Sequence, residues 1–145
     1  MKEIEVREST YEKVGAPCTL YSGPLTVCIA VGAIHNGFAY LAHCVDVFKM
    51  KEPLEALVKD LKRDTVEGSA AKVYIAGGGI EEYWSPGSKD DMKRAREEVL
   101  VSIERAGFKD QIEKIEWRPA GYVQALRIIP SEGRVEFKNL GELEY

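Results

Sequence analysis

The spacing of apolar residues alternates along this chain between a period of two, typical of strands, and a period near 3.6, typical of helices. A helix is predicted over residues 53–64, where an apolar stripe follows Pro53, a residue favoured at the first helical position. A second helix is predicted from Ser88, which opens a capping-box-like Ser88-Lys89-Asp90-Asp91, to about Ala106, with Gly107 as its C-cap. Strands are predicted at residues 2–7, 17–22, 25–34, 38–45, 71–76, 112–117, 122–129 and 134–137.

These elements predict an α+β fold in one domain spanning residues 1–145. Residues 2–7 alternate weakly and are interpreted as an edge strand, and 112–117 is expected to pair with 122–129. The composition, 45% hydrophobic and 30% charged, is that of an ordinary soluble domain.

Charge and hydropathy exclude several classes of partner. The net charge of −4 and the pI near 5.3 argue against nucleic acid, since a duplex-binding surface is normally basic. No apolar stretch approaches the ~18 residues that a membrane-spanning helix needs. The N-terminus lacks the apolar core of a secretory signal, so a cytoplasmic protein is expected.

A predicted β-hairpin carries the most informative chemistry. Asn36-Gly37 lies between two apolar runs, and this dipeptide favours a two-residue type I′ turn. With that turn, His43 faces Ala30, and Cys28 becomes a diagonal neighbour of His43 on the same face, with Cα atoms roughly 7–8 Å apart. A loop longer by one residue would place the two side chains on opposite faces.

A thiol beside an imidazole is the minimal set for a cysteine nucleophile, because the ring can take the thiol proton. Such a partner is expected to lower the pKa of Cys28 and to make it the most reactive cysteine. The alternative is that Cys28 is a small hydrophobic core residue. Cys18 and Cys44 are interpreted as core or strand residues, and the odd count of three argues against a disulfide scaffold.

The order of these segments resembles the chemoreceptor glutamine deamidase (CheD) family, in which a Cys-bearing strand is followed by a strand with the catalytic His. In that family a Thr lies six residues before the Cys; here Ser22 lies six before Cys28. Leu41-Ala42-His43-Cys44 is also similar to the Leu-x-His-Cys segment of protein N-terminal asparagine amidohydrolases. The chain departs from CheD proteins at the nucleophile, where Thr26-Val27-Cys28 replaces Gly-Ser-Cys.

The resemblance implies layered mixed or antiparallel sheets flanked by two main helices. It also implies a cysteine-dependent deamidase acting on a Gln or Asn side chain of a protein or peptide. Cys28 would be the nucleophile and His43 the base, and Ser22 or a backbone carbonyl would orient the imidazole. Other small cysteine hydrolases, and a non-catalytic module that binds a protein partner, stay open as alternatives, as does the oligomeric state.

Gly77 and Gly78 follow a buried strand and are candidate substrate-binding residues, since glycines let a backbone approach a ligand. The alternative is a simple strand-to-helix connection. No cofactor is expected. No metal is expected either, because the chain lacks Cys-x-x-Cys and its histidines share no evident ligand partners.

Overall fold

The computed structural model describes residues 2–65 and 70–144. In chain order the elements are β1 (Glu3–Glu5), β2 (Thr10–Gly15), β3 (Thr19–Tyr21), β4 (Ile29–His35), β5 (Phe38–Cys44), α1 (Glu52–Asp64), β6 (Lys72–Gly77), α2 (Pro86–Arg105), the 3-10 turn η1 (Lys109–Gln111), β7 (Ile112–Trp117), β8 (Tyr122–Ile129), the 3-10 turn η2 (Pro130–Glu132) and β9 (Arg134–Glu142).

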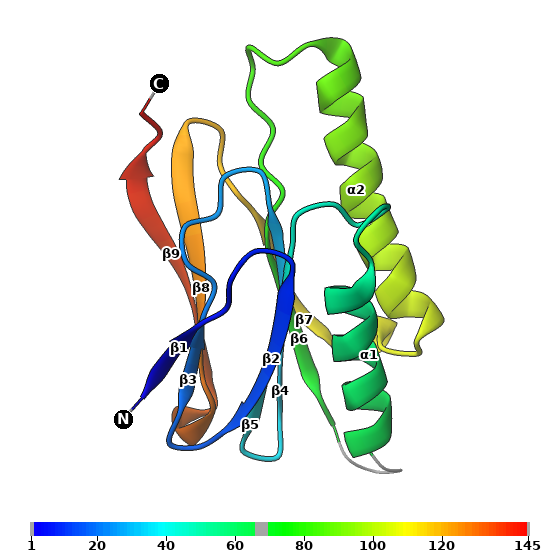
Figure 1. The fold of residues 1–145 in the computed structure, drawn as a ribbon, viewed down its shortest axis with the longest axis vertical. Helices are drawn as coiled ribbons and strands as arrows, with labels where there is room; N and C mark the ends of the chain where they lie inside the picture. The colour runs from blue at the N-terminus through cyan, green and yellow to red at the C-terminus, as the bar shows by residue number, and fades with distance from the viewer. Residues whose placement is uncertain (1, 66–69, 145) are drawn as a thin grey trace.

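Two mixed sheets and two helices form three layers, which is an α+β architecture (Figure 1). One sheet has the order β1-β3-β8-β9 and the other the order β2-β5-β4-β6-β7. Both helices cover the outer face of the five-stranded sheet, and the four-stranded sheet covers its inner face (Figure 1). The α+β prediction is therefore confirmed.

Alternation along β4 separates the two cores. Ile29 and Val31 point toward the helices, whereas Ala30 points toward the four-stranded sheet. Gly32 also faces that sheet, and a Cβ there would come within 3.5 Å of Leu126 and Ile128 side chains. The β4–β5 hairpin therefore has one face under the helices and the other between the two sheets.

Several predicted elements need correction. The predicted pairing of 112–117 with 122–129 is wrong: β7 pairs with β6 in parallel, while β8 lies in the other sheet between β3 and β9. Strand β2 was not predicted. Helix α2 begins earlier than predicted, because Ser85 rather than Ser88 is its N-cap and accepts a hydrogen bond from the Ser88 N–H. Strand β4 begins at Ile29, so Cys28 lies just before it.

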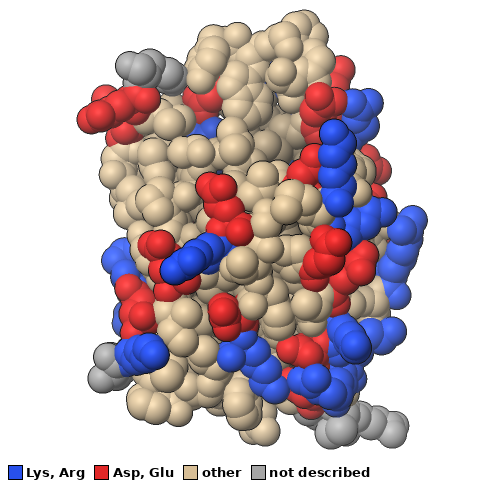
Figure 2. Space-filling model, viewed as in Figure 1, with Lys and Arg blue, Asp and Glu red and all other residues tan. Residues whose placement is uncertain are grey.

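Acidic and basic side chains are interspersed on the face seen in Figure 2. Within the described residues, neither helix combines the length and the apolar character needed to cross a bilayer. The three cysteines are free thiols: Cys28 and Cys44 are buried and Cys18 is partly exposed.

Candidate functional site

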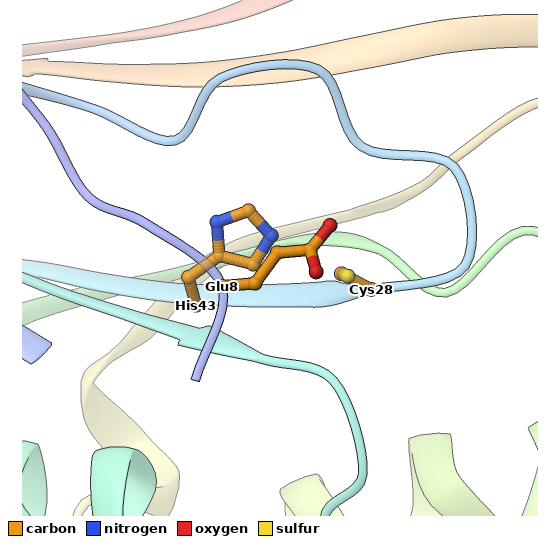
Figure 3. A group of neighbouring side chains, drawn as sticks. All are labelled: Glu8, Cys28 and His43. Atoms are coloured by element: carbon orange, nitrogen blue, oxygen red, sulfur yellow. The ribbon is translucent and has the colours of Figure 1, made fainter. Parts of the chain in front are cut away.

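The β4–β5 hairpin brings Cys28 and His43 together, as the sequence predicted. The turn residues Asn36 and Gly37 have φ values of 49° and 79°, as a type I′ turn requires. Ala30 pairs with His43 in the observed register. The Cys28 sulfur, a ring nitrogen of His43 and a carboxylate oxygen of Glu8 all lie within 4.8 Å of one another (Figure 3).

His43 is oriented by the main chain. Its Nδ1 lies 2.9 Å from the carbonyl oxygen of Val6. A carbonyl only accepts, so Nδ1 carries the hydrogen and Nε2 carries the lone pair of the neutral ring. Nε2 is buried and has no hydrogen-bond partner among the described residues. It is therefore available as a base or as a ligand.

Glu8 is the member of this cluster that the sequence did not predict. It lies in the turn between β1 and β2, and the Ser9 N–H in the same turn donates to the His43 carbonyl oxygen at 2.8 Å. Strand β2 continues this contact, since Thr10 pairs with His43 in β5. Glu8 is exposed, whereas Cys28 and His43 are each only 3% exposed. The turn therefore places a solvated carboxylate over a buried thiol and imidazole.

The thiol of Cys28 is not activated in this arrangement. Burial, and to a smaller extent the nearby Glu8 carboxylate, raise its pKa to about 11. The expectation that the imidazole lowers this pKa is therefore wrong for the free protein. At pH 7 only about one such thiol in 10⁴ is ionised.

Ser22 does not orient the imidazole. Its hydroxyl donates to the Gly23 carbonyl oxygen at 2.7 Å and accepts from the Leu126 N–H at 2.9 Å. Both contacts are buried, and the second attaches the loop before Cys28 to strand β8. The prediction allowed either Ser22 or a backbone carbonyl to orient the imidazole. The structure has the second arrangement, with the Val6 carbonyl oxygen against His43 Nδ1.

Gly77 and Gly78 lie against the backbone of Cys28, and their N–H groups are both paired within the protein. The Gly78 N–H donates to the Cys28 carbonyl oxygen at 2.9 Å, and the Gly77 N–H donates to Gln124 Oε1 at 2.7 Å. A Cβ on Gly77 would collide with the Cys28 carbonyl oxygen. The two glycines therefore position the Cys28 backbone, and their substrate-binding role stays a prediction.

A buried ion pair fixes the other side of the same loop. Arg118 and Glu81 form a salt bridge of 2.5 Å, and their side chains are 1% and 4% exposed. Arg118 Nε also donates to the Thr26 carbonyl oxygen at 2.7 Å, two residues before Cys28. The position of Cys28 thus depends on contacts from β6, from the β7–β8 connection and from β8.

A cavity of about 800 Å³ lies on the opposite face of the hairpin, between the segment after β5 and helix α2. Its lining includes Val27, Val45, Phe48, Trp84 and Met92. Trp84 lies in the connection between β6 and α2. Neither Cys28 nor His43 is among the lining residues, but Val27 precedes Cys28 directly.

Neither a model of a known protein family nor a curated protein matches this sequence. The chemistry of the site is therefore inferred from its own geometry.

Proposed function

We propose that this protein is a cysteine-dependent amidohydrolase, similar to the CheD-like deamidases, that acts on a Gln or Asn side chain of a cytoplasmic protein or peptide. The observation that carries the proposal is the buried, unpartnered Nε2 of His43 beside the Cys28 thiol. An imidazole whose other nitrogen is held by a carbonyl is a prepared general base.

In the proposed reaction, His43 Nε2 takes the Cys28 proton as the sulfur attacks the amide carbon. The tetrahedral intermediate collapses, the imidazolium gives its proton to the leaving nitrogen, and ammonia departs. Water, deprotonated by the same Nε2, then attacks the thioester, and the carboxylic acid and the thiol are released. Glu8 favours the imidazolium formed in each half-reaction, because a nearby carboxylate stabilises the positive charge.

Proton transfer has to accompany the attack, because the high pKa of Cys28 leaves little thiolate beforehand. The separation of up to 4.8 Å between sulfur and ring nitrogen exceeds a hydrogen bond, and such contacts in free enzymes tighten when substrate binds. The amide would reach the sulfur past Glu8, the exposed member of the cluster.

A second candidate is a non-catalytic module that binds a protein partner. The burial of Cys28 favours it, since a nucleophile needs access to its substrate. Exposed Val27, Val45 and Phe48 beside the large cavity offer an apolar surface for such a partner.

Ammonia release in the presence of a chelator separates the candidates. We expect glutamine- or asparagine-containing protein substrates to lose ammonia with the wild type and with Cys18→Ser, but not with Cys28→Ser or His43→Ala. Cys18→Ser is the matched control because it changes another thiol outside the cluster. Release of an amine in place of ammonia would indicate a peptidase.

A glutamine-derived chloromethyl ketone tests the nucleophile without the cognate protein. We expect intact-mass analysis followed by peptide mapping to place one adduct on Cys28, and to find none in His43→Ala. Full ammonia release by Cys28→Ser would refute the mechanism. A wild type that takes up no adduct at Cys28 would favour the interaction module.

A further inference from the structure

Glu8, Cys28 and His43 come from three separate segments of the chain and direct a carboxylate, a thiol and an imidazole toward one point (Figure 3). Oxygen, sulfur and nitrogen donors of these three kinds are the protein ligands of zinc. Zinc bonds of about 2.0–2.3 Å place tetrahedral ligands roughly 3.3–3.8 Å apart. The observed limit of 4.8 Å thus requires only a small contraction of the cluster.

The surroundings of His43 give a second, independent observation. Its Nε2 is buried without a hydrogen-bond partner, and a buried polar atom of that kind is costly to leave unpaired. Its Nδ1 faces the Val6 carbonyl oxygen at 2.9 Å. Metal-binding histidines are typically held in this way, because the outer hydrogen bond fixes the tautomer and the direction of the ligating nitrogen.

The charge at the site also favours a cation. The Glu8 carboxylate lies within 4.8 Å of both the Cys28 sulfur and a ring nitrogen of His43. A divalent cation at this point would face one carboxylate and a thiol, and a thiol that coordinates such a cation is deprotonated. Glu8 then becomes an attractive neighbour of the cation.

We propose that Glu8, Cys28 and His43 bind one Zn²⁺ ion, whose fourth ligand is a water molecule, and that the bound ion blocks Cys28 as a nucleophile. The Cys28 sulfur loses its proton to solvent on binding, so one proton is released for each ion bound. The inference uses the residues of the proposed hydrolase but does not require that activity.

Cobalt binding tests the ligand set directly. The protein is freed of metal with a chelator, dialysed and titrated with Co²⁺. We expect one ion per chain, a thiolate-to-cobalt charge-transfer band and the visible absorption of tetrahedral Co²⁺. Zn²⁺ should displace the bound Co²⁺ and abolish both absorptions. Zinc should also protect Cys28 from iodoacetamide, as read by peptide mapping.

Variants assign the ligands. Cys28→Ser should lose the charge-transfer band, and His43→Gln should lose the tetrahedral spectrum. Glu8→Gln should weaken binding and still fold, since its side chain is exposed. Cys18→Ser is the matched control and should keep the wild-type spectrum and affinity. Circular dichroism checks the fold of each variant.

Three results would overturn the inference: no charge-transfer band in the wild type, a band that survives in Cys28→Ser, or an unchanged affinity in Glu8→Gln. These measurements involve no substrate, whereas the ammonia assay is run with chelator. A protein that releases ammonia but binds no zinc would therefore remove only the metal site. Zinc binding without ammonia release would remove only the hydrolase.

Discussion

Replacing Gly77 with alanine should destabilise the protein more than the same change at another glycine with a similar backbone. Gly77 has a φ of +87°, and a Cβ there would collide with the Cys28 carbonyl oxygen. Gly107, just after α2, has a φ of +91°, and a Cβ there would have no heavy atom within 4 Å. The two positions therefore share the backbone penalty, and only one has the collision.

The expected magnitudes follow from these two contributions. A left-handed conformation costs an L-residue about 1–2 kcal/mol, which is the whole expected effect of Gly107→Ala. Overpacking in a rigid interior adds about 1–3 kcal/mol, so Gly77→Ala should lose roughly 2–5 kcal/mol. The collision is with the main chain of Cys28, directly beside the Ile29–Gly77 pair of β4 and β6, and this backbone cannot move aside as a flexible side chain could.

Urea unfolding at equilibrium, followed by circular dichroism, measures both free energies. The difference between the variants should be about 1–3 kcal/mol, or roughly 2–12 °C in Tm for a domain of this size. The rate at which Cys28 is alkylated should also change in Gly77→Ala, whereas in Gly107→Ala it should equal the wild-type rate. Equal losses of stability in the two variants would refute the idea that Gly77 is needed for the approach of the Cys28 backbone.

Three further predictions concern the site and its frame. Cys28, with a pKa raised to about 11, should react with iodoacetamide slowly at pH 7 and faster as pH rises, and Glu8→Gln should speed labelling; a pH-independent rate would contradict this. Ser22→Ala should cost about 1–3 kcal/mol in urea unfolding by leaving the Leu126 N–H unpaired, with ammonia release per folded molecule unchanged. The hydrogen bond from Lys13 is the main reason that the pKa of Asp64 is lowered, so the ionised carboxylate should stabilise the fold above pH ~4 and progressively less as pH falls further. Thermal unfolding should therefore show Asp64→Asn to be less stable than the wild type at pH 7, and this difference in stability should narrow in acid.

The hairpin could be predicted because its signals are local. Asn36-Gly37 specifies the turn, and the period of two then places Cys28 and His43 on the same face. The helix stripes are equally local: Leu54, Leu57 and Leu61 are buried as their spacing predicts. Where residues close together in the sequence determine the geometry, the pattern of apolar and turn residues is enough to predict it.

Strand β7 shows where chain order misleads. Its short connection to β8 favours a hairpin, yet β7 joins β6 through the helix α2, as parallel strands require a long crossover. The connection to β8 is diverted by Arg118, which is buried against Glu81 and also donates to the Tyr122 carbonyl oxygen at 2.7 Å. That ion pair joins residues far apart in the sequence, so no local pattern indicates it.

The same reason accounts for the absence of Glu8 from the predicted site. Strand β2 lies at a sheet edge, and its face toward α1 is held by polar contacts in place of apolar alternation: Tyr11 donates to Asp60 at 2.6 Å and Lys13 to Asp64 at 2.7 Å. Without β2, nothing places the preceding turn beside His43. Once β2 is paired, Glu8 is brought beside Cys28, and the Cys–His pair becomes a cluster of three potential ligands. The added carboxylate opposes formation of the Cys28 thiolate and favours the binding of a cation. The choice between nucleophile and metal ligand therefore depends on one edge strand, and Glu8→Gln should weaken metal binding while it speeds alkylation of the Cys28 thiol.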